Sequence, residues 1–216
     1  MKRFTRSRLA QVNVLLAALS IAVLDKASGN RRPHRLMPFY HVAIYCGLRQ
    51  GELFGLRWKD VDLERRELRV AGQIQHGTRA RGKTKRAHRA IPLSTETVRI
   101  LKWQKQNQAE EQRISAKGWN ASDLVFCSEI GTPLNPKTIG DQFDTLLRKN
   151  ELPDIRFHGL RHTYAALSIA AGVDIYTLSR QMGHSTISVT ADRYGHLYQG
   201  HSQDIDALDQ LLKRSA

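Results

Sequence analysis

Apolar residues recur at the spacing of an α-helix along most of the chain. In these stretches they return every three or four residues, which is the period of a helix packed against other elements. The stretches with this character span residues 5–24, 34–46, 94–113, 136–149, 158–171, 175–182 and 186–194. A shorter helix is expected around Glu52, followed by a turn over residues 58–62. The pattern therefore predicts a protein that is mainly α-helical.

Local signals mark the ends of several of these helices. Ser94, Asn135 and Asp174 stand where N-cap residues are expected, and Pro136 suits a first helical turn. Glycine follows the last helical residue at positions 47, 172 and 183, and glycine is the commonest residue just beyond a helix. These signals divide the chain into separate helices joined by short loops.

Strand-like composition is confined to a few short stretches. Residues 67–75 and 88–93 are predicted to be two strands, and residues 123–127 a short buried strand. Residues 76–87 are cationic and contain two glycines, as expected for a flexible hairpin tip. Residues 25–33 and 116–123 have loop composition. The fold class expected is α+β, mainly α with a small antiparallel β-sheet.

The chain shows neither an internal repeat nor a linker, so residues 1–200 are expected to form one domain. Residues 201–216 are expected to form a C-terminal helical arm. The apolar residues of this arm share one helical face: Ile205, Leu208, Leu211 and Leu212.

Charge adds a class of partner to this picture. The 216 residues include 34 Lys and Arg against 20 Asp and Glu, a formal net charge of +14. Such an excess attracts a polyanion, because each cation that neutralises a phosphate releases a counterion. With 41% hydrophobic residues the chain also has enough apolar surface for a core. Composition therefore favours a folded protein that binds nucleic acid.

The two cysteines suit a reducing compartment, and the N-terminal segment lacks the marks of a signal peptide. Cys46 and Cys127 lie far apart, so neither a disulfide framework nor a zinc knuckle is expected. An apolar run follows the basic N-terminus, but Gln11 and Asn13 interrupt its start and no small-residue cleavage site follows. No stretch has enough apolar residues to span a bilayer. We expect a cytoplasmic protein, bacterial or phage-encoded, without a membrane partner.

The residues suited to chemistry gather in the last third of the chain. His158 and Arg161 are three residues apart on one expected helix, and therefore share a face. His184 follows a helix-ending glycine, where its ring can point into a cleft, and Tyr194 comes ten residues later. Another arginine, Arg49, lies far upstream. Arginine binds phosphate, histidine transfers protons and tyrosine can act as a nucleophile, so this set indicates phosphodiester chemistry.

A metal site is the main alternative for the histidines. His158 and His162 are four residues apart, as in a helical metal pair. No glutamate stands between them as in H-E-x-x-H, and no third ligand is placed. We therefore expect no metal and no cofactor, and interpret His162 as a structural hydrogen-bonding residue.

Four motifs carry a resemblance to a known family. HGLRHTYA resembles the H-x-x-R box of the tyrosine recombinases, also called the phage integrase family, and MGHSTISVTADRY resembles their L-G-H-S…Y segment with methionine for leucine. CGLRQGELFGLRWKDVD is similar to their first arginine box, with cysteine for threonine, and GKTKRAHRAIPL to their lysine-bearing hairpin. The motifs cover residues 45–198 in the family's order. The resemblance implies the catalytic-domain fold of that family.

The resemblance also implies a role for each residue. Arg49 and Arg161 would hold the scissile phosphate, and Tyr194 would attack phosphorus to form a 3′-phosphotyrosine, which conserves bond energy without ATP. His158 and His184 would hydrogen-bond the phosphate, with His158 able to accept the tyrosine proton. The remaining two members are Lys83, which would protonate the departing 5′ oxygen, and Glu52, which would orient the cations. Lys85 is the alternative to Lys83, and Tyr198 to Tyr194.

The resemblance implies a site-specific DNA recombinase that acts on double-stranded DNA as a tetramer on synapsed sites, and as a monomer when free. A topoisomerase-like nicking and rejoining enzyme, or a non-catalytic DNA-binding relative, is the alternative. An N-terminal core-binding domain is not expected in this chain, which is either cut from a longer integrase or naturally short. The C-terminal arm would dock on a neighbouring protomer or pack on its own core.

Overall fold

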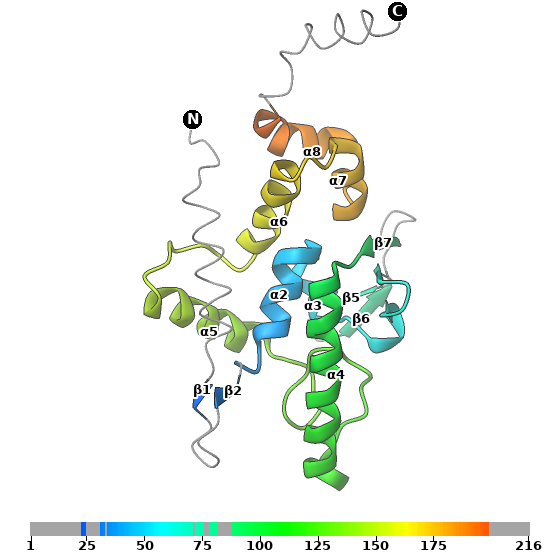
Figure 1. Ribbon diagram of the computed structural model, residues 1–216, viewed down its shortest axis with the longest axis vertical. Helices are drawn as coiled ribbons and strands as arrows, with labels where there is room; N and C mark the ends of the chain where they lie inside the picture. Colours follow the sequence, from blue (N-terminus) through cyan, green and yellow to red (C-terminus); the bar gives the residue numbers. More distant parts are fainter. Residues whose placement is uncertain are drawn as a thin grey trace, which may run out of the picture.

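The computed structural model describes residues 23–24, 31–32, 34–70, 72–75, 78–81 and 88–198. Its α-helices are α2 (Met37–Cys46), α3 (Gln50–Phe54), α4 (Thr95–Ser115), α5 (Pro136–Lys149), α6 (Gly159–Ala170), α7 (Ile175–Met182) and α8 (Ile187–Tyr194). Single 3-10 turns are η1 (Trp58–Asp60), η3 (Ala116–Gly118) and η4 (Gly195–Leu197). In Figure 1, α6, α7 and α8 gather at one end of the molecule, above α2 and α4.

Within the described residues, the strands form three small antiparallel sheets. The largest joins β3 (Val61–Asp62), β4 (Glu67–Val70) and β7 (Arg89–Pro92) in the order β3-β4-β7, with Leu68 opposite Ile91. A separate pair joins β5 (Gly72–Gln75) to β6 (Thr78–Arg81). The third pair joins β1 (Val23–Leu24) to β2 (Arg31–Arg32). The predicted α+β class, with helices dominant and a small antiparallel sheet, is confirmed.

The predicted caps are in place. The side chains of Ser94, Asn135 and Asp174 each accept a hydrogen bond from a backbone N–H in the first turn of the helix that follows. Gly47 and Gly183 end α2 and α7 in the left-handed conformation, with φ of 57° and 65°. These boundaries follow from signals that lie within a few residues of each helix end.

Several sequence-based boundaries are wrong, chiefly where strand pairing decides. Residues 67–75 form β4 and β5 in different sheets, and residues 78–81 of the expected hairpin tip form β6. Val23 and Leu24, expected to end a helix, pair instead with residues 31 and 32 of an expected loop. Residues 61–62, expected in a turn, form β3, and α2 begins at Met37 rather than at residue 34. A strand forms only when a partner satisfies its backbone groups, and that partner leaves no mark in the local pattern.

Residues 124–127 are buried as expected and Asp123 is exposed, but residues 123–127 do not form a strand. Two isolated bridges hold this segment, between Arg57 and Leu124 and between Cys127 and Pro133. Side chains of α4 take the place of a neighbouring strand, because the amides of Gln104 and Gln108 donate hydrogen bonds to the carbonyls of Val125 and Leu124. The remaining expected segments, residues 1–22, 82–87 and 201–216, lie outside the described residues.

The main hydrophobic core surrounds α2. Phe39 is fully buried and its ring contacts those of Phe54, Phe126 and Phe157, which come from three other segments of the chain. Burying an aromatic side chain of this size contributes roughly 1.5–3 kcal/mol. The start of the first arginine box is thereby fixed against the centre of the domain, since α2 leads directly to Arg49.

A smaller core lies between α6, α7 and α8. Its buried members are Tyr164, Ala165, Ile169, Leu178, Met182 and Tyr194. The expected nucleophile, Tyr194, is therefore a core residue of this cluster with 5% of its surface exposed. The two cores meet where α6 crosses from one to the other, because Leu160 belongs to the larger core and Tyr164 to the smaller.

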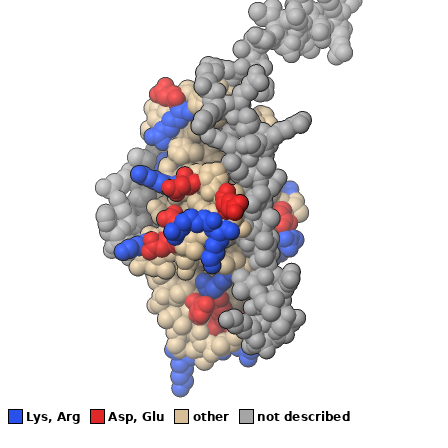
Figure 2. All heavy atoms as spheres, turned by 90° about the vertical axis from the view of Figure 1, so that its left-hand side faces the viewer, with Lys and Arg blue, Asp and Glu red and all other residues tan. Residues whose placement is uncertain are grey.

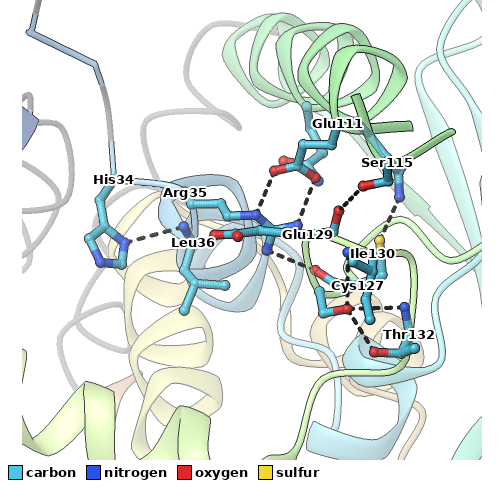
Figure 3. A network of polar contacts seen from close by, with 12 residues as sticks. His34, Arg35, Leu36, Glu111, Ser115, Cys127, Glu129, Ile130 and Thr132 are labelled. Carbon is cyan, nitrogen blue, oxygen red and sulfur yellow. Dashed lines mark hydrogen bonds and ion pairs between the residues drawn. The ribbon is translucent and has the colours of Figure 1, made fainter. Parts of the chain in front are cut away.

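A polar network fastens the far end of α4. Arg35 forms a two-pronged ion pair with Glu111, with Nε and Nη2 at 2.6 and 2.8 Å from the two carboxylate oxygens. Its Nη1 donates to the carbonyl of Cys127 at 2.8 Å, and Ser115 donates to the carbonyl of Glu129 (Figure 3). This network ties the chain entering α2 and the 127–132 turn to one helix, well away from the chemically suited residues.

Surface charge is mixed on the side of the molecule that carries α5. Figure 2 shows blue and red side chains interspersed on the described part of this face. Among the described residues, none of the helices combines the length and the hydrophobicity that a membrane span requires.

Candidate active site

A buried carboxylate joins two arginines from different parts of the chain. Arg49 stands at the N-terminus of α3 and donates from Nη1 to Oε1 of Glu52 at 2.9 Å and from its backbone N–H to Oε2 at 2.8 Å. Arg89, on β7, donates to both oxygens of the same carboxylate, at 3.0 and 2.8 Å. The side chains of Glu52 and Arg89 are 5% and 6% exposed. Arg89 and Glu52 thus form a two-pronged ion pair, and Arg49 adds a second positive charge to the same carboxylate.

The charge of Glu52 is maintained by these partners. Burial alone would raise the pKa of its carboxyl group, but the hydrogen bonds and charges of Arg89 and Arg49 outweigh burial and hold the pKa below the usual value. The expected role of Glu52 in orienting cations agrees with these contacts.

The arginines also converge on the C-terminal end of α7. Arg89 donates from Nε to the carbonyl of Gln181 at 2.5 Å. Arg161 donates from Nη2 to the carbonyl of Met182, and Arg49 from Nη2 to that of Gly183, both at 2.5 Å. The last carbonyls of a helix lack partners within it and carry the negative end of its dipole. Three consecutive carbonyls therefore hold three guanidinium groups side by side.

Arg161 is the most deeply placed of the three. It is 5% exposed and donates a further hydrogen bond to the carbonyl of Gly47, at the end of α2. Burial and the neighbouring charge of Arg49 lower the pKa of Arg161 to about 10, so the group is still protonated at neutral pH. α6 thereby connects the end of α2 to the end of α7.

Gly183 is required where α7 meets Arg89. Its φ of 65° is a left-handed conformation that side chains rarely adopt, and a Cβ placed on it would lie 2.8 Å from Nη1 of Arg89. The absence of a side chain here allows the guanidinium of Arg89 to reach both Glu52 and the helix end.

His184 lies next to this arginine cluster. It is 9% exposed, and its Nδ1 is 2.7 Å from Oγ1 of Thr190, which is fully buried on α8. Burial, together with the charges of Arg161 and Arg49, lowers the pKa of His184 to about 4. The ring is therefore neutral at neutral pH. One of its nitrogens donates and the other accepts, so Nε2 takes the role that Nδ1 does not take toward Thr190.

Tyr194 ends α8 and contacts α6 through a different histidine from the one expected. Its hydroxyl is 2.7 Å from Nδ1 of His162, and the rings are 5.8 Å apart. His158, at the N-terminus of α6, meets the ring of His162 edge-on at 5.2 Å. Burial raises the pKa of Tyr194, and the charges of Arg161 and Arg193 partly offset this rise.

Tyr198, the alternative nucleophile, has a structural contact. Its hydroxyl donates to the backbone carbonyl of Val173 at 2.8 Å. It packs on the edge of the smaller core, whereas the hydroxyl of Tyr194 meets a histidine beside the arginine cluster.

The structure brings together most of the residues that the sequence singled out. Arg49, Arg161 and His184 meet at the end of α7, and Glu52 binds Arg49. His158 and Tyr194 each contact His162. Lys83 and Lys85 lie outside the described residues. In the part of the chain that is described, no three His, Cys, Asp or Glu side chains are grouped to hold a metal ion.

Sequence reasoning missed Arg89, Thr190 and the contact of His162. Arg89 had a usable signal, because it shares a strand face with the buried Ile91 and an inward-facing charge demands a partner. Thr190 had none, since its partner His184 is on a turn whose direction depends on α8.

A cleft of about 900 Å³ opens beside this cluster. Its walls are β7, α7 and the start of α8, and they include Arg89, His184 and the exposed side chains of Tyr176 and Ile187. One edge of the arginine and histidine group is thus open to a bulky ligand.

Comparison with known proteins agrees with this arrangement. The chain is 34% identical over 181 residues to a tyrosine recombinase XerC-like protein of Caldanaerobacter subterraneus subsp. tengcongensis, covering 76% of this chain and 46% of that protein. It is 32% identical over 184 residues to the ICEBs1 integrase of Bacillus subtilis, covering 81% and 48%. The chain thus spans about half the length of these curated relatives.

A solved structure shows the same fold. The Tn1549 transposon integrase, solved in complex with transposon right end DNA, superposes with a TM-score of 0.71 at 23% identity, covering 100% of this chain and 66% of that one. The signature of the phage integrase family matches residues 8–201. This match spans both cores and the whole arginine and histidine cluster, and the chain belongs to the phage integrase family of tyrosine recombinases.

Proposed function

We propose that this chain is the catalytic part of a site-specific recombinase that cuts and rejoins double-stranded DNA through Tyr194. One observation carries the proposal. Arg49 and Arg161, from segments more than a hundred residues apart, are held at the end of α7 beside His184. Tyr194 lies on the neighbouring helix with its hydroxyl on a histidine. This combination supplies cations for a phosphodiester and a nucleophile within one site.

The roles follow from the chemistry of phosphoryl transfer. The guanidinium groups of Arg49 and Arg161 would bind the non-bridging oxygens, where negative charge grows in the transition state. Because carbonyls and Glu52 already fix these groups, little reorganisation is needed when DNA binds. His158 and His184 would add hydrogen bonds to the phosphate. Lys83 would protonate the departing 5′ oxygen, and the strand would rejoin by the reverse reaction.

The domain organisation and partners belong to the same proposal. Residues 1–200 would form the catalytic domain and residues 201–216 an arm, as the family match over residues 8–201 supports. Double-stranded DNA as partner is supported by the net charge of +14, and by the DNA bound to the Tn1549 integrase of the same fold. A monomer that assembles into a tetramer on two synapsed sites is the expected assembly, which sedimentation with and without DNA would check.

Covalent capture on DNA of random sequence tests the proposal, because the protein itself then selects its target site. The chain is incubated with nicked duplexes whose central segment is random, and complexes that survive denaturing detergent are recovered and sequenced. We expect protein-linked DNA enriched in one sequence. The Tyr194→Phe variant should give none, while the matched Tyr198→Phe variant should behave like the unsubstituted chain.

Three outcomes would contradict parts of the proposal. Adducts that persist in Tyr194→Phe would exclude this nucleophile. Relaxation of supercoiled DNA of unrelated sequence by a monomer would indicate a topoisomerase-like enzyme. DNA binding without any adduct would indicate a non-catalytic relative.

A further inference from the structure

His162 is the side chain that contacts the tyrosine hydroxyl. Its Nδ1 lies 2.7 Å from Oη of Tyr194, a short hydrogen bond between a phenol and an imidazole. α6 makes this possible because neighbouring residues of a helix point in different directions. Arg161 therefore reaches the end of α7, while His162 reaches α8.

The charged groups around His162 favour its neutral form. Burial, followed by the charges of Arg193 on α8 and Arg161 on α6, lowers the pKa of His162. Its other titratable neighbours are His158 on the preceding turn and Tyr194 itself. A neutral ring with its proton on Nε2 leaves Nδ1 free to accept a proton. The ring also remains exposed to solvent, to which it can later release that proton.

The nucleophile needs such a partner. Tyr194 is 5% exposed and its pKa is raised by burial, so the hydroxyl is protonated at neutral pH. A protonated phenol is a weak nucleophile, and a positioned base typically contributes about 10²–10⁴ in rate. His158 was the expected base, but the ring that contacts the hydroxyl is that of His162.

We propose that His162 is a catalytic residue, the general base that accepts the hydroxyl proton of Tyr194, an inference that rests on the proposed function. Oη of Tyr194 forms a bond to phosphorus while the bond from phosphorus to the 5′ oxygen breaks. The hydroxyl proton passes to Nδ1 of His162. The departing 5′ oxygen takes up a proton, which Lys83 is expected to supply, and every transfer reverses on rejoining.

Substitution by asparagine separates a base from a structural partner. Oδ1 of an asparagine stands near the place of a histidine Nδ1, so His162→Asn can keep the hydrogen bond to Tyr194 but cannot accept a proton. We expect adduct formation on the nicked duplex selected from the random pool to slow by about 100-fold or more. Exposed His196, two residues after Tyr194, supplies the matched control, and His196→Asn should leave the rate unchanged.

A second variant adds a readout that a purely structural role would not move. In His162→Ala, added imidazole should restore adduct formation, and the restored rate should follow the concentration of neutral imidazole as pH rises. The unsubstituted chain should show a rise in rate with pH that is lost in His162→Asn, because only the unprotonated ring accepts the proton.

Each contrary result overturns the inference. A His162→Asn rate equal to that of the unsubstituted chain would make His162 a positioning residue only. Faster adduct formation by His162→Ala would mean that the contact restrains Tyr194. If added imidazole does not restore adduct formation in His162→Ala, the inference that this position accepts the proton fails. If the unsubstituted chain forms no adduct, the proposed function fails and this inference fails with it. If the unsubstituted chain is active and the His162 variants are equally active, only this inference fails.

Discussion

The two sides of the site are built differently. On the arginine side, Arg49, Arg89 and Arg161 each make at least two contacts, to Glu52 or to backbone carbonyls at the ends of α2 and α7. On the tyrosine side, the described contact of the Tyr194 hydroxyl is a single hydrogen bond to a solvent-exposed histidine. The groups expected to hold phosphate are thus preorganised, whereas the proposed nucleophile is restrained by one hydrogen bond and by packing. The difference suits a reaction in which phosphate stays fixed and the tyrosine oxygen moves.

Removing the charge of Glu52 should have the largest effect on stability. Glu52→Gln leaves the buried guanidinium of Arg89 without its counter-charge, and breaking such a buried pair costs about 3–5 kcal/mol. Urea unfolding at neutral pH would measure this. The exposed pair of Glu96 with Arg99 is the control, since water and salt screen this pair and Glu96→Ala should destabilise the protein far less. If both variants lost the same free energy of unfolding, the buried pair of Glu52 with Arg89 would stabilise the protein no more than an exposed ion pair does.

Acid should destabilise the arginine side through His184. The folded-state pKa of His184 is about 4, below its usual 6.5, so the unfolded chain binds more protons between these values. Its contribution, on the order of 3 kcal/mol, is present above pH 6.5 and lost as pH falls through about 4. The ion pairs with Arg89 and Arg49 hold the pKa of Glu52 below its usual value, so this carboxylate takes up its proton at a lower pH than an ordinary glutamate does.

The pH dependence can be assigned by substitution. Urea unfolding between pH 7 and pH 4 should show a smaller fall in stability for His184→Gln than for the unsubstituted chain. An identical fall in both proteins would contradict the burial of an uncharged His184.

Adding a side chain at Gly183 should strain the backbone there and displace the guanidinium group of Arg89. Gly183→Ala must adopt a left-handed φ, at a cost of about 1–2 kcal/mol, and must displace Arg89. Gly140→Ala in α5 is the opposite case, because nothing lies within 4 Å of its Cβ and alanine favours a helix by about 1 kcal/mol. The midpoint temperature of thermal unfolding should therefore fall for Gly183→Ala and rise for Gly140→Ala. A Gly183→Ala protein as stable as the unsubstituted chain would exclude this constraint.

The tyrosine side should show the smallest effect on stability. Tyr194→Phe keeps the ring in the smaller core and removes one hydrogen bond to an exposed partner, a loss of about 0.5–1.5 kcal/mol. The same change should abolish covalent capture of DNA. A stability loss as large as that of Glu52→Gln would remove the contrast between the two sides.

Local signals explain which parts of the fold were predictable. Helix ends at Gly47, Gly183, Ser94 and Asp174 were predicted because caps act within a few residues. Strand boundaries failed at residues 67–81, since pairing is decided between segments and not within them.

The same distinction applies to the site. Arg49, Arg161, His184 and Tyr194 stood out by residue type and spacing, and the structure places them on neighbouring elements. The carbonyls of residues 181–183 could not be predicted, because backbone acceptors look alike in every sequence. The link from Arg89 to Glu52 spans 37 positions and depends on how β7 packs against α3 and α7.

The most direct measurement is peptide mapping of the captured protein–DNA adduct by mass spectrometry. After digestion of protein and DNA, fragmentation of the peptide that contains Tyr194 should place a nucleotide phosphate on that tyrosine and leave Tyr198 unmodified. A nucleotide on Tyr198 or on any other residue would contradict the central claim that Tyr194 is the nucleophile of this site.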